Sequence, residues 1–175
     1  FAGYYVAAAK GFYKDAGLDV TILPGGPDIN PQQVLAGGGA DVVVASRKYD
    51  NCVATAAEIE AETGRAAMPY GVHVGRWAEL DGLVEGVYDR FGRLDVLVNN
   101  AGMSPLYESL NDVTEKLFDT VVNLNLKGPF RLSVLAGERM AAAGGGVIVN
   151  VSTPGSLRPH PAYLPYAMAK AGLNA

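Results

Sequence analysis

The sequence predicts an α/β fold in which helices cover both faces of a doubly wound, mostly parallel sheet. Short apolar runs alternate along the chain with longer stretches of helical pattern. A strand, a helix and a second strand in succession form the crossover unit that joins parallel strands. At 175 residues the chain has the length of about one domain, enough to bury a sizeable core.

Four strands are expected where runs of Val, Ile, Leu and Ala are bounded by polar residues or glycine. They cover residues 40–45, 66–74, 94–99 and 147–151. Helices are expected between and after them, at residues 50–63, 77–91, 114–142 and from residue 163 onward. In such folds the ligand crevice lies beyond the carboxyl ends of the strands, where Asn99, Ser152 and the residues after Val44 fall.

Composition argues against several classes of protein. The 14 basic and 18 acidic residues nearly balance, so neither a nucleic acid nor a membrane surface is an expected partner. The single Cys52 fits a reducing compartment, and no apolar run is long enough to span a bilayer, so the cytoplasm is expected. His73 and His160 are the only histidines and there is no Cys/His cluster, so no metal site is expected. A start at Phe1 and an end inside a predicted helix indicate a truncated chain or a fusion product.

A phenol and an ammonium lie four residues apart in Tyr166-Ala-Met-Ala-Lys170. On a helix these side chains share one face, so the Lys170 ammonium can stabilise the phenolate that forms when Tyr166 gives up its proton. Three polar motifs precede this pair, two at the ends of predicted strands and one within a predicted helix. They are Asn99-Asn-Ala-Gly102, Asn125 within Asn123-Leu-Asn-Leu-Lys-Gly128, and Ser152-Thr153.

These elements, in this order, resemble the short-chain dehydrogenase/reductase family over residues 38–175. The resemblance implies a Rossmann-like domain that interconverts a carbonyl and an alcohol on a small molecule with a nicotinamide cofactor. It implies that Tyr166 is the general acid/base and that Lys170 tunes it and anchors the nicotinamide ribose. Asn125 would hold a water molecule in the proton relay.

By the same resemblance, a hydroxyl of Ser152 or Thr153 binds the substrate oxygen. The usual spacing of thirteen residues before Tyr166 points to Thr153, whose β-branched side chain is stiffer than that of Ser152. Either hydroxyl can donate a hydrogen bond, so both are candidates.

The resemblance also implies the residues that bind the cofactor. They are Ser46, Arg47, Val74, Asn99, Ala101 and Gly102, together with Tyr166 and Lys170. Arg47 and Ser46 follow the strand where the adenosine ribose sits. An arginine there suits a 2′-phosphate, whereas an acid would take a 2′-hydroxyl, so NADP is favoured and NAD is the alternative.

Other positions carry weaker implications. His73 departs from the acidic residue that family members usually place before Val74 to bind adenine. Arg158, His160, Tyr163 and Pro165 lie on a loop that contacts substrate in the family, or that is simply held by its prolines. Family members generally pair through long helices, so the helix at 114–142 favours a homo-oligomer.

Residues 1–37 do not fit that family, which opens with a strand and a glycine-rich loop. Their sequence resembles the N-terminus of periplasmic solute-binding proteins of the thiamine-precursor, nitrate, sulfonate and taurine class, so a boundary near residue 37 and a chimera are expected. A strand at 18–23 followed by Pro24-Gly-Gly-Pro27 is the candidate substitute for the missing strand and loop. Losing two or three charge-assisted hydrogen bonds to pyrophosphate would weaken cofactor binding at least about a hundredfold.

Two further interpretations stay open. The chain could be a non-enzymatic module that binds a small ligand through its first 37 residues. It could also be a relic whose Tyr, Lys and Ser cleft performs other acid–base chemistry.

Overall fold

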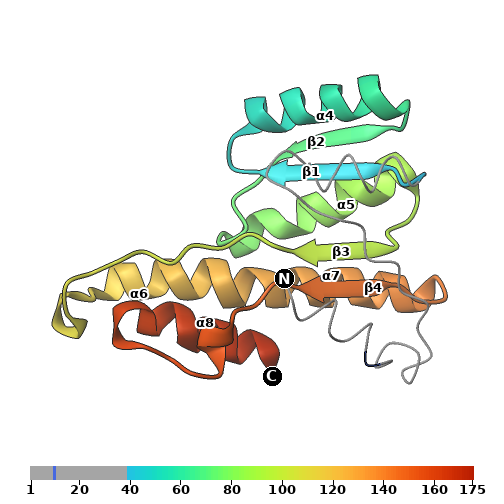
Figure 1. Ribbon diagram of the computed structural model, residues 1–175. Coiled ribbons are helices and arrows are strands. Elements are labelled where there is room, and N and C mark those ends of the chain that lie inside the picture. Colours follow the sequence, from blue (N-terminus) through green and yellow to red (C-terminus); the bar gives the residue numbers. More distant parts are fainter. Residues whose placement is uncertain (1–9, 11–38) are drawn as a thin grey trace.

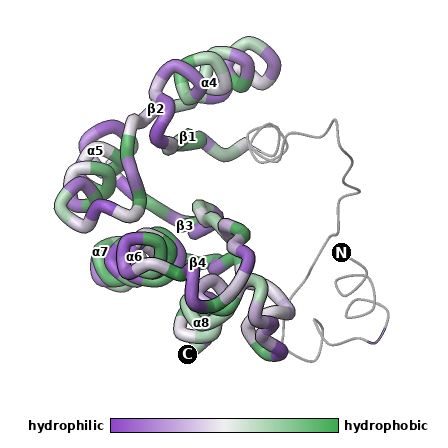
Figure 2. The backbone as a smooth tube through the Cα atoms, turned by 90° about the vertical axis from the view of Figure 1, so that its left-hand side faces the viewer, coloured by the Kyte–Doolittle hydropathy of each residue, from purple (hydrophilic) through white to green (hydrophobic). Residues whose placement is uncertain are grey.

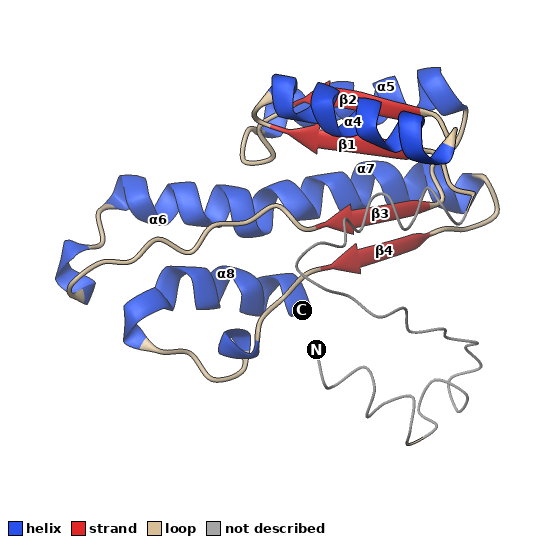
Figure 3. Ribbon diagram, turned by 45° about the horizontal axis from the view of Figure 1, so that its top comes forward, coloured by secondary structure: helices blue, strands red, loops and turns tan. Residues whose placement is uncertain are grey.

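The computed structural model describes Lys10 and residues 39–175. The four strands are β1 (Val42–Ser46), β2 (Ala67–Gly71), β3 (Val96–Asn99) and β4 (Val147–Asn150). The five α-helices of this part are α4 (Tyr49–Thr63), α5 (Leu80–Phe91), α6 (Glu115–Val122), α7 (Gly128–Ala142) and α8 (Leu164–Asn174). All four strands point the same way, so their carboxyl ends share one edge (Figures 1 and 3). Within residues 39–175, none of the helices is both long and apolar enough to cross a bilayer.

Each of the four strands expected between residues 40 and 151 is present, with ends that shift by a few residues. The largest difference is at β2, which stops at Gly71 although the apolar run continues to Val74. Its partner sets this limit, because β1 ends at Ser46, opposite Gly71 in the parallel register. Pro69 lies within β2 and lacks an N–H, which suits a strand at the edge of a sheet.

The strands form two parallel pairs, β1 with β2 and β3 with β4. In Figure 1 β1 and β3 are the inner members of these pairs, giving the spatial order β2, β1, β3, β4. Among residues 39–175 no strand is hydrogen-bonded between β1 and β3. The strand expected at 18–23 and the loop at 24–27 lie outside the described residues.

The main core lies between the strands and the helices α5 and α7, which stand together on one side of β3 and β4 (Figure 2). Its buried members are Val72, Leu80, Leu83, Val84, Val87 and Leu132. Leu97 of β3 packs against this cluster, and Ile148 of β4 lies close to Gly137 of α7. The strands therefore turn these alternate side chains toward the helices.

The opposite face of the β3–β4 pair is apolar and exposed. It carries Val96, Val98, Val147 and Val149, which keep between 42% and 55% of their surface accessible. Valines on both faces of a strand are typical of a parallel sheet that is covered on both sides. Within the described part of the chain, only the face toward α5 and α7 is covered.

The helix expected at 114–142 is present but contains an irregular turn. Thr114 caps α6 by accepting the Leu117 N–H at 3.2 Å, and the π-helical turn η3 (Asn123–Lys127) joins α6 to α7. At the start of α7, a Cβ added to Gly128 would lie 2.2 Å from the Val74 carbonyl oxygen. Only glycine lets the helix approach the backbone after β2 this closely.

Candidate active site

A cavity of about 210 Å³ opens just beyond the carboxyl ends of β3 and β4. Its walls come from the loop after β3, the residue after β4 and the first turns of α8. The lining residues are Asn100, Gly102, Met103, Ser104, Val151, Tyr166 and Lys170. The tertiary structure thus brings three of the predicted residues, Gly102, Tyr166 and Lys170, to one cavity.

Tyr166 and Lys170 lie on the same side of α8, as their spacing predicts. The Lys170 Nζ atom lies 6.0 Å from the centre of the Tyr166 ring and donates a 2.6 Å hydrogen bond to the Val151 carbonyl. Only 2% of the Lys170 surface is exposed. Burial lowers the pKa of the Lys170 ammonium below its usual value, because the charged form loses hydration. This ammonium has three donors, of which the Val151 carbonyl uses one.

Asn125 is fully buried in the π-helical turn and fixes the loop after β3. Its Oδ1 accepts the Met103 N–H at 3.2 Å, while its Nδ2 donates to the carbonyls of Met103 and Val121, both at 2.9 Å. Single π-helical turns occur often at functional sites, and here the turn accommodates a side chain that bonds to the backbone of its own helix. Asn125 therefore lies directly behind the cavity wall.

The two candidate hydroxyls have different surroundings. The Thr153 Oγ1 accepts the Gly155 N–H at 3.2 Å and so caps the short 3₁₀ helix Pro154–Ser156. Ser152 is exposed, and among residues 39–175 its hydroxyl has no recorded hydrogen bond. The loop after these residues is tied down, because Ser156 Oγ donates to the Thr153 carbonyl and accepts from Asn174 Nδ2 of α8.

The side chain of Asn99, the last residue of β3, is turned into the sheet. It is buried, and its Nδ2 donates to Ser133 Oγ at 3.1 Å and to Asn150 Oδ1 at 2.9 Å. These bonds join β3 to β4 and to α7. Its Oδ1 is buried and has no hydrogen-bond partner within the described residues. The side chain of Asn99 thus supports the sheet and is absent from the lining of the cavity.

The remaining predicted cofactor residues lie outside the cavity. Ser46 is the last residue of β1, and both it and Arg47 are exposed at the carboxyl end of that strand. Val74 packs against Gly128, and Ala101 is exposed on the loop after β3. Sequence reasoning missed Asn100, Met103 and Ser104, which line the cavity. Asn100 lies within the motif Asn99-Asn-Ala-Gly102, from which its neighbours were predicted. Met103 and Ser104 follow this motif, and no sequence pattern marks them as site residues.

The profile of the short chain dehydrogenase family matches residues 32–175. The chain belongs to this family.

Relatives and solved structures agree with that assignment. Dehydrogenase/reductase SDR family member 4 from Pongo abelii is 35% identical over 139 residues, which are 79% of this chain and 50% of that protein. A metagenomic short-chain oxidoreductase in complex with NADP superposes with a TM-score of 0.77 at 31% identity, over 82% of this chain and 64% of that one. NAD⁺-bound xylitol dehydrogenase, at 24% identity, shares the fold with a TM-score of 0.75 over 81% of this chain and 54% of its own.

These matches confirm the predicted Rossmann-like α/β fold. The chain spans about half the length of the curated relative that it matches. A second profile, described as NMT1/THI5 like, matches residues 1–59, which confirms that the N-terminal segment resembles a different family. The two matches overlap at residues 32–59, around the boundary that the sequence predicts near residue 37.

Proposed function

We propose that this chain carries the proton-transfer site of an NADP-dependent oxidoreductase that interconverts a carbonyl and an alcohol on a small molecule. One observation carries the proposal. Tyr166 and Lys170 meet at the wall of a 210 Å³ cavity, beyond the strands whose ends define the ligand crevice of this fold.

Tyr166 would transfer the proton to or from the substrate oxygen. It is half-buried at the cavity, and the Lys170 Nζ atom lies 6.0 Å from the centre of its ring. A proton donor placed in this way typically contributes about 10²–10⁴-fold to the rate.

Ser152 is the better of the two hydroxyls for the substrate oxygen. It is exposed two residues after β4, whereas Thr153 is half-buried and its side chain is held in place by the Gly155 N–H that its oxygen accepts. The Oδ1 and Nδ2 atoms of Asn125 are both used in hydrogen bonds to the backbone of Met103 and Val121, so this side chain holds the cavity wall. A water in the relay would therefore be bound by other atoms of this turn, its backbone among them.

The cavity fits one end of a dinucleotide. Sites that enclose a whole drug-sized ligand measure roughly 300–1,000 Å³, which exceeds the 210 Å³ present here. Lys170 and Tyr166 would hold the nicotinamide ribose, because they offer donors and an acceptor for its hydroxyls. Gly102 and Ala101 would lie beside it. When bound, the nicotinamide supplies or accepts the hydride.

The opposite end of the cofactor would lie at the end of β1. Ser46 and Arg47 are exposed there and suit a 2′-phosphate, which favours NADP, with NAD as the alternative. Val74 would pack on the adenine. The sequence lacks the family's glycine-rich loop before β1, so we expect the affinity for either nucleotide to be reduced.

A homo-oligomer and a cytoplasmic location also belong to this proposal. Phe130 and Val134 are exposed on α7, and the ring of Trp77 stacks on Phe130 with centroids 6.3 Å apart. Such an apolar surface on the long helix is suited to pairing with a second copy.

The second candidate function is binding of a small ligand by the N-terminal segment. The NMT1/THI5-like match at residues 1–59 favours it. In that case the chain would bind its ligand without redox chemistry, and Tyr166 would be dispensable.

Reduction of a panel of ketones and aldehydes with NADPH tests the proposed function. Wild type should consume NADPH, and Tyr166→Phe should lose at least about 10²-fold in kcat while its unfolding transition barely changes. Equal rates for wild type and Tyr166→Phe would show that the activity does not use this site.

A further inference from the structure

We propose that Tyr107 is a positioning residue for Tyr166. Its phenol, on the loop between β3 and α6, clamps the first turn of the helix that carries Tyr166. The inference rests on the proposed role of Tyr166 and adds a residue that the catalytic motif does not contain.

The clamp consists of two hydrogen bonds to one oxygen. Tyr107 Oη donates to the Pro161 carbonyl at 2.5 Å and accepts the Leu164 N–H at 2.7 Å. Leu164 is the first residue of α8, which begins two residues before Tyr166. The phenol therefore bonds to the backbone on both sides of the point where this helix begins.

The beginning of α8 needs such a partner. The first N–H groups of a helix have no acceptor within the helix and are usually satisfied by a capping side chain. The N-cap residue of α8 is Tyr163, which makes no capping hydrogen bond with its side chain, and Pro165 has no N–H to offer. Tyr107 supplies the missing acceptor from 57 residues away in the sequence.

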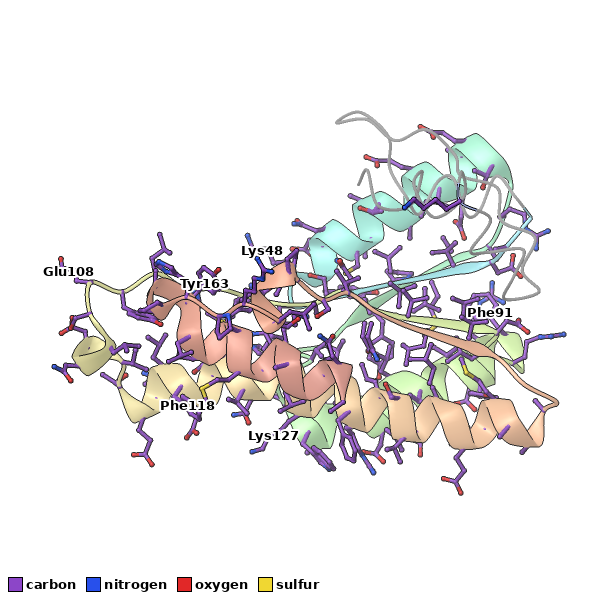
Figure 4. The ribbon with its side chains drawn as sticks, turned by 60° about the horizontal axis from the view of Figure 1, so that its bottom comes forward. Lys48, Phe91, Glu108, Phe118, Lys127 and Tyr163 are labelled. Carbon is purple, nitrogen blue, oxygen red and sulfur yellow. The ribbon has the colours of Figure 1, made fainter. Side chains whose placement is uncertain are left out.

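Tyr107 and Tyr166 also line the same narrow pocket. Its lining is almost entirely apolar, and its other members are Pro105, Leu117, Val121, Tyr163 and Pro165. The loop that carries Glu108 passes the end of α8 that follows Tyr163 (Figure 4). Tyr107 therefore faces the same pocket as Tyr166 while its hydroxyl holds the backbone.

The other end of the loop is fixed to Asn125. Met103 exchanges two hydrogen bonds with the Asn125 amide, four residues before Tyr107. Gly102, Met103 and Ser104 line the cavity at this end. The loop consequently connects the cavity wall to the start of α8, and Tyr107 sets where Tyr166 stands relative to that wall. A misplacement of about 1 Å can cost about 10²-fold in rate.

Tyr107→Phe tests the inference, because it keeps the ring and removes only the hydroxyl. Tyr88→Phe is the matched control, since the Tyr88 hydroxyl is buried without a hydrogen-bond partner in the described part of the chain. We expect Tyr107→Phe to lower kcat for carbonyl reduction about tenfold or more and to change the Kd for NADPH by a smaller factor, since Tyr166 would supply only part of the contact with the ribose and Arg47 is untouched. Tyr88→Phe should change neither value.

Two NMR measurements separate this inference from the proposed function. In Tyr107→Phe, the Leu164 amide should exchange with solvent at least about tenfold faster, because it loses its acceptor. The ¹³Cζ resonance of Tyr166 in tyrosine-labelled protein, assigned by its absence from Tyr166→Phe, should shift in Tyr107→Phe and stay in place in Tyr88→Phe. A chain without carbonyl reductase activity would refute the proposed function, and the Tyr166 resonance would still report on the clamp. An unshifted Tyr166 resonance would overturn the inference, even if Leu164 exchanged faster, because Tyr107 would then only cap a helix.

Discussion

Asn125 Oδ1 lies 2.8 Å from the point where a Cβ atom on Gly102 would stand. The same oxygen accepts the Met103 N–H at 3.2 Å. A carbon–oxygen approach below 3.0 Å is repulsive, so the contact between the loop and the π-helical turn requires a glycine at position 102. The close approach of the Asn125 amide therefore explains why the motif Asn99-Asn-Ala-Gly102 ends in a glycine.

Gly102→Ala should reduce the free energy of unfolding by about 1–3 kcal/mol, because the added methyl group pushes the Asn125 amide away from Met103. A double-mutant cycle with Asn125→Ala identifies the cause. In the Asn125→Ala background the clashing oxygen is gone, so the same substitution at residue 102 should cost less than half as much. Urea denaturation measures all four proteins, and strictly additive losses would contradict the explanation.

Gly128→Ala should be more damaging than any other substitution to alanine in α7. Its Cβ would lie 2.2 Å from the Val74 carbonyl oxygen, which belongs to the backbone and cannot rotate away. We expect a loss of about 3 kcal/mol or more, or no folded protein. Gly137→Ala in the same helix is the control. Its Cβ would lie 3.7 Å from Ile148 Cδ1, an ordinary contact, so helix propensity should yield a gain of up to about 1 kcal/mol. Similar melting temperatures for the two variants would refute the packing argument.

Lys170→Met should raise the melting temperature at pH 7, because burial of the ammonium costs hydration and lowers its pKa. The same substitution should abolish activity, because it removes a residue of the proposed site. Between that lowered pKa and about 10.4, the unfolded chain binds one proton more than the folded chain at this residue. The free energy of unfolding of wild type should therefore rise with pH in this window, and the advantage of Lys170→Met should shrink. The hydrogen bond to Val151 offsets part of the cost.

Lys127→Met is the control for this pH dependence, since Lys127 is exposed and its side chain points away from the helices (Figure 4). Thermal melts from pH 7 to pH 10 give the comparison. A difference between wild type and Lys170→Met that stays constant over this range would contradict the desolvation account.

Arg47→Ala should remove the preference for NADPH over NADH. If Kd for NADPH is about 0.1 mM, 1 mM nucleotide should stabilise wild type by about 1.4 kcal/mol, and NADH by less. The variant should respond equally to both nucleotides, because only the contact with the 2′-phosphate is lost. Lys48→Ala, one residue further, serves as the control. Differential scanning fluorimetry measures the shifts, and a wild type that responds more strongly to NADH would reverse the assignment of NADP.

Local sequence patterns determined much of this protein. The apolar runs predicted the four strands found within residues 39–175, because a strand buried in a parallel sheet needs apolar side chains over its whole length. The four-residue spacing placed Tyr166 and Lys170 on one side of a helix, because helical geometry repeats over that distance. Motif order was enough to identify the family.

The tertiary structure decided the features that depend on residues distant in the chain. The Met103 backbone bonds to a side chain 22 residues away, and Tyr107 bonds to a helix start 57 residues away. Neither partner is marked in the local pattern, since any peptide N–H or carbonyl can take part in such a bond. The burial of Lys170 likewise depends on how α8 packs against α6 and the π-helical turn, and on the Val151 carbonyl that follows β4. The periodicity of the sequence determines which side chains lie on the same face of a helix or strand. Where that face lies in the protein is determined by hydrogen bonds between segments that are distant in the sequence, and these bonds form only when the chain is packed.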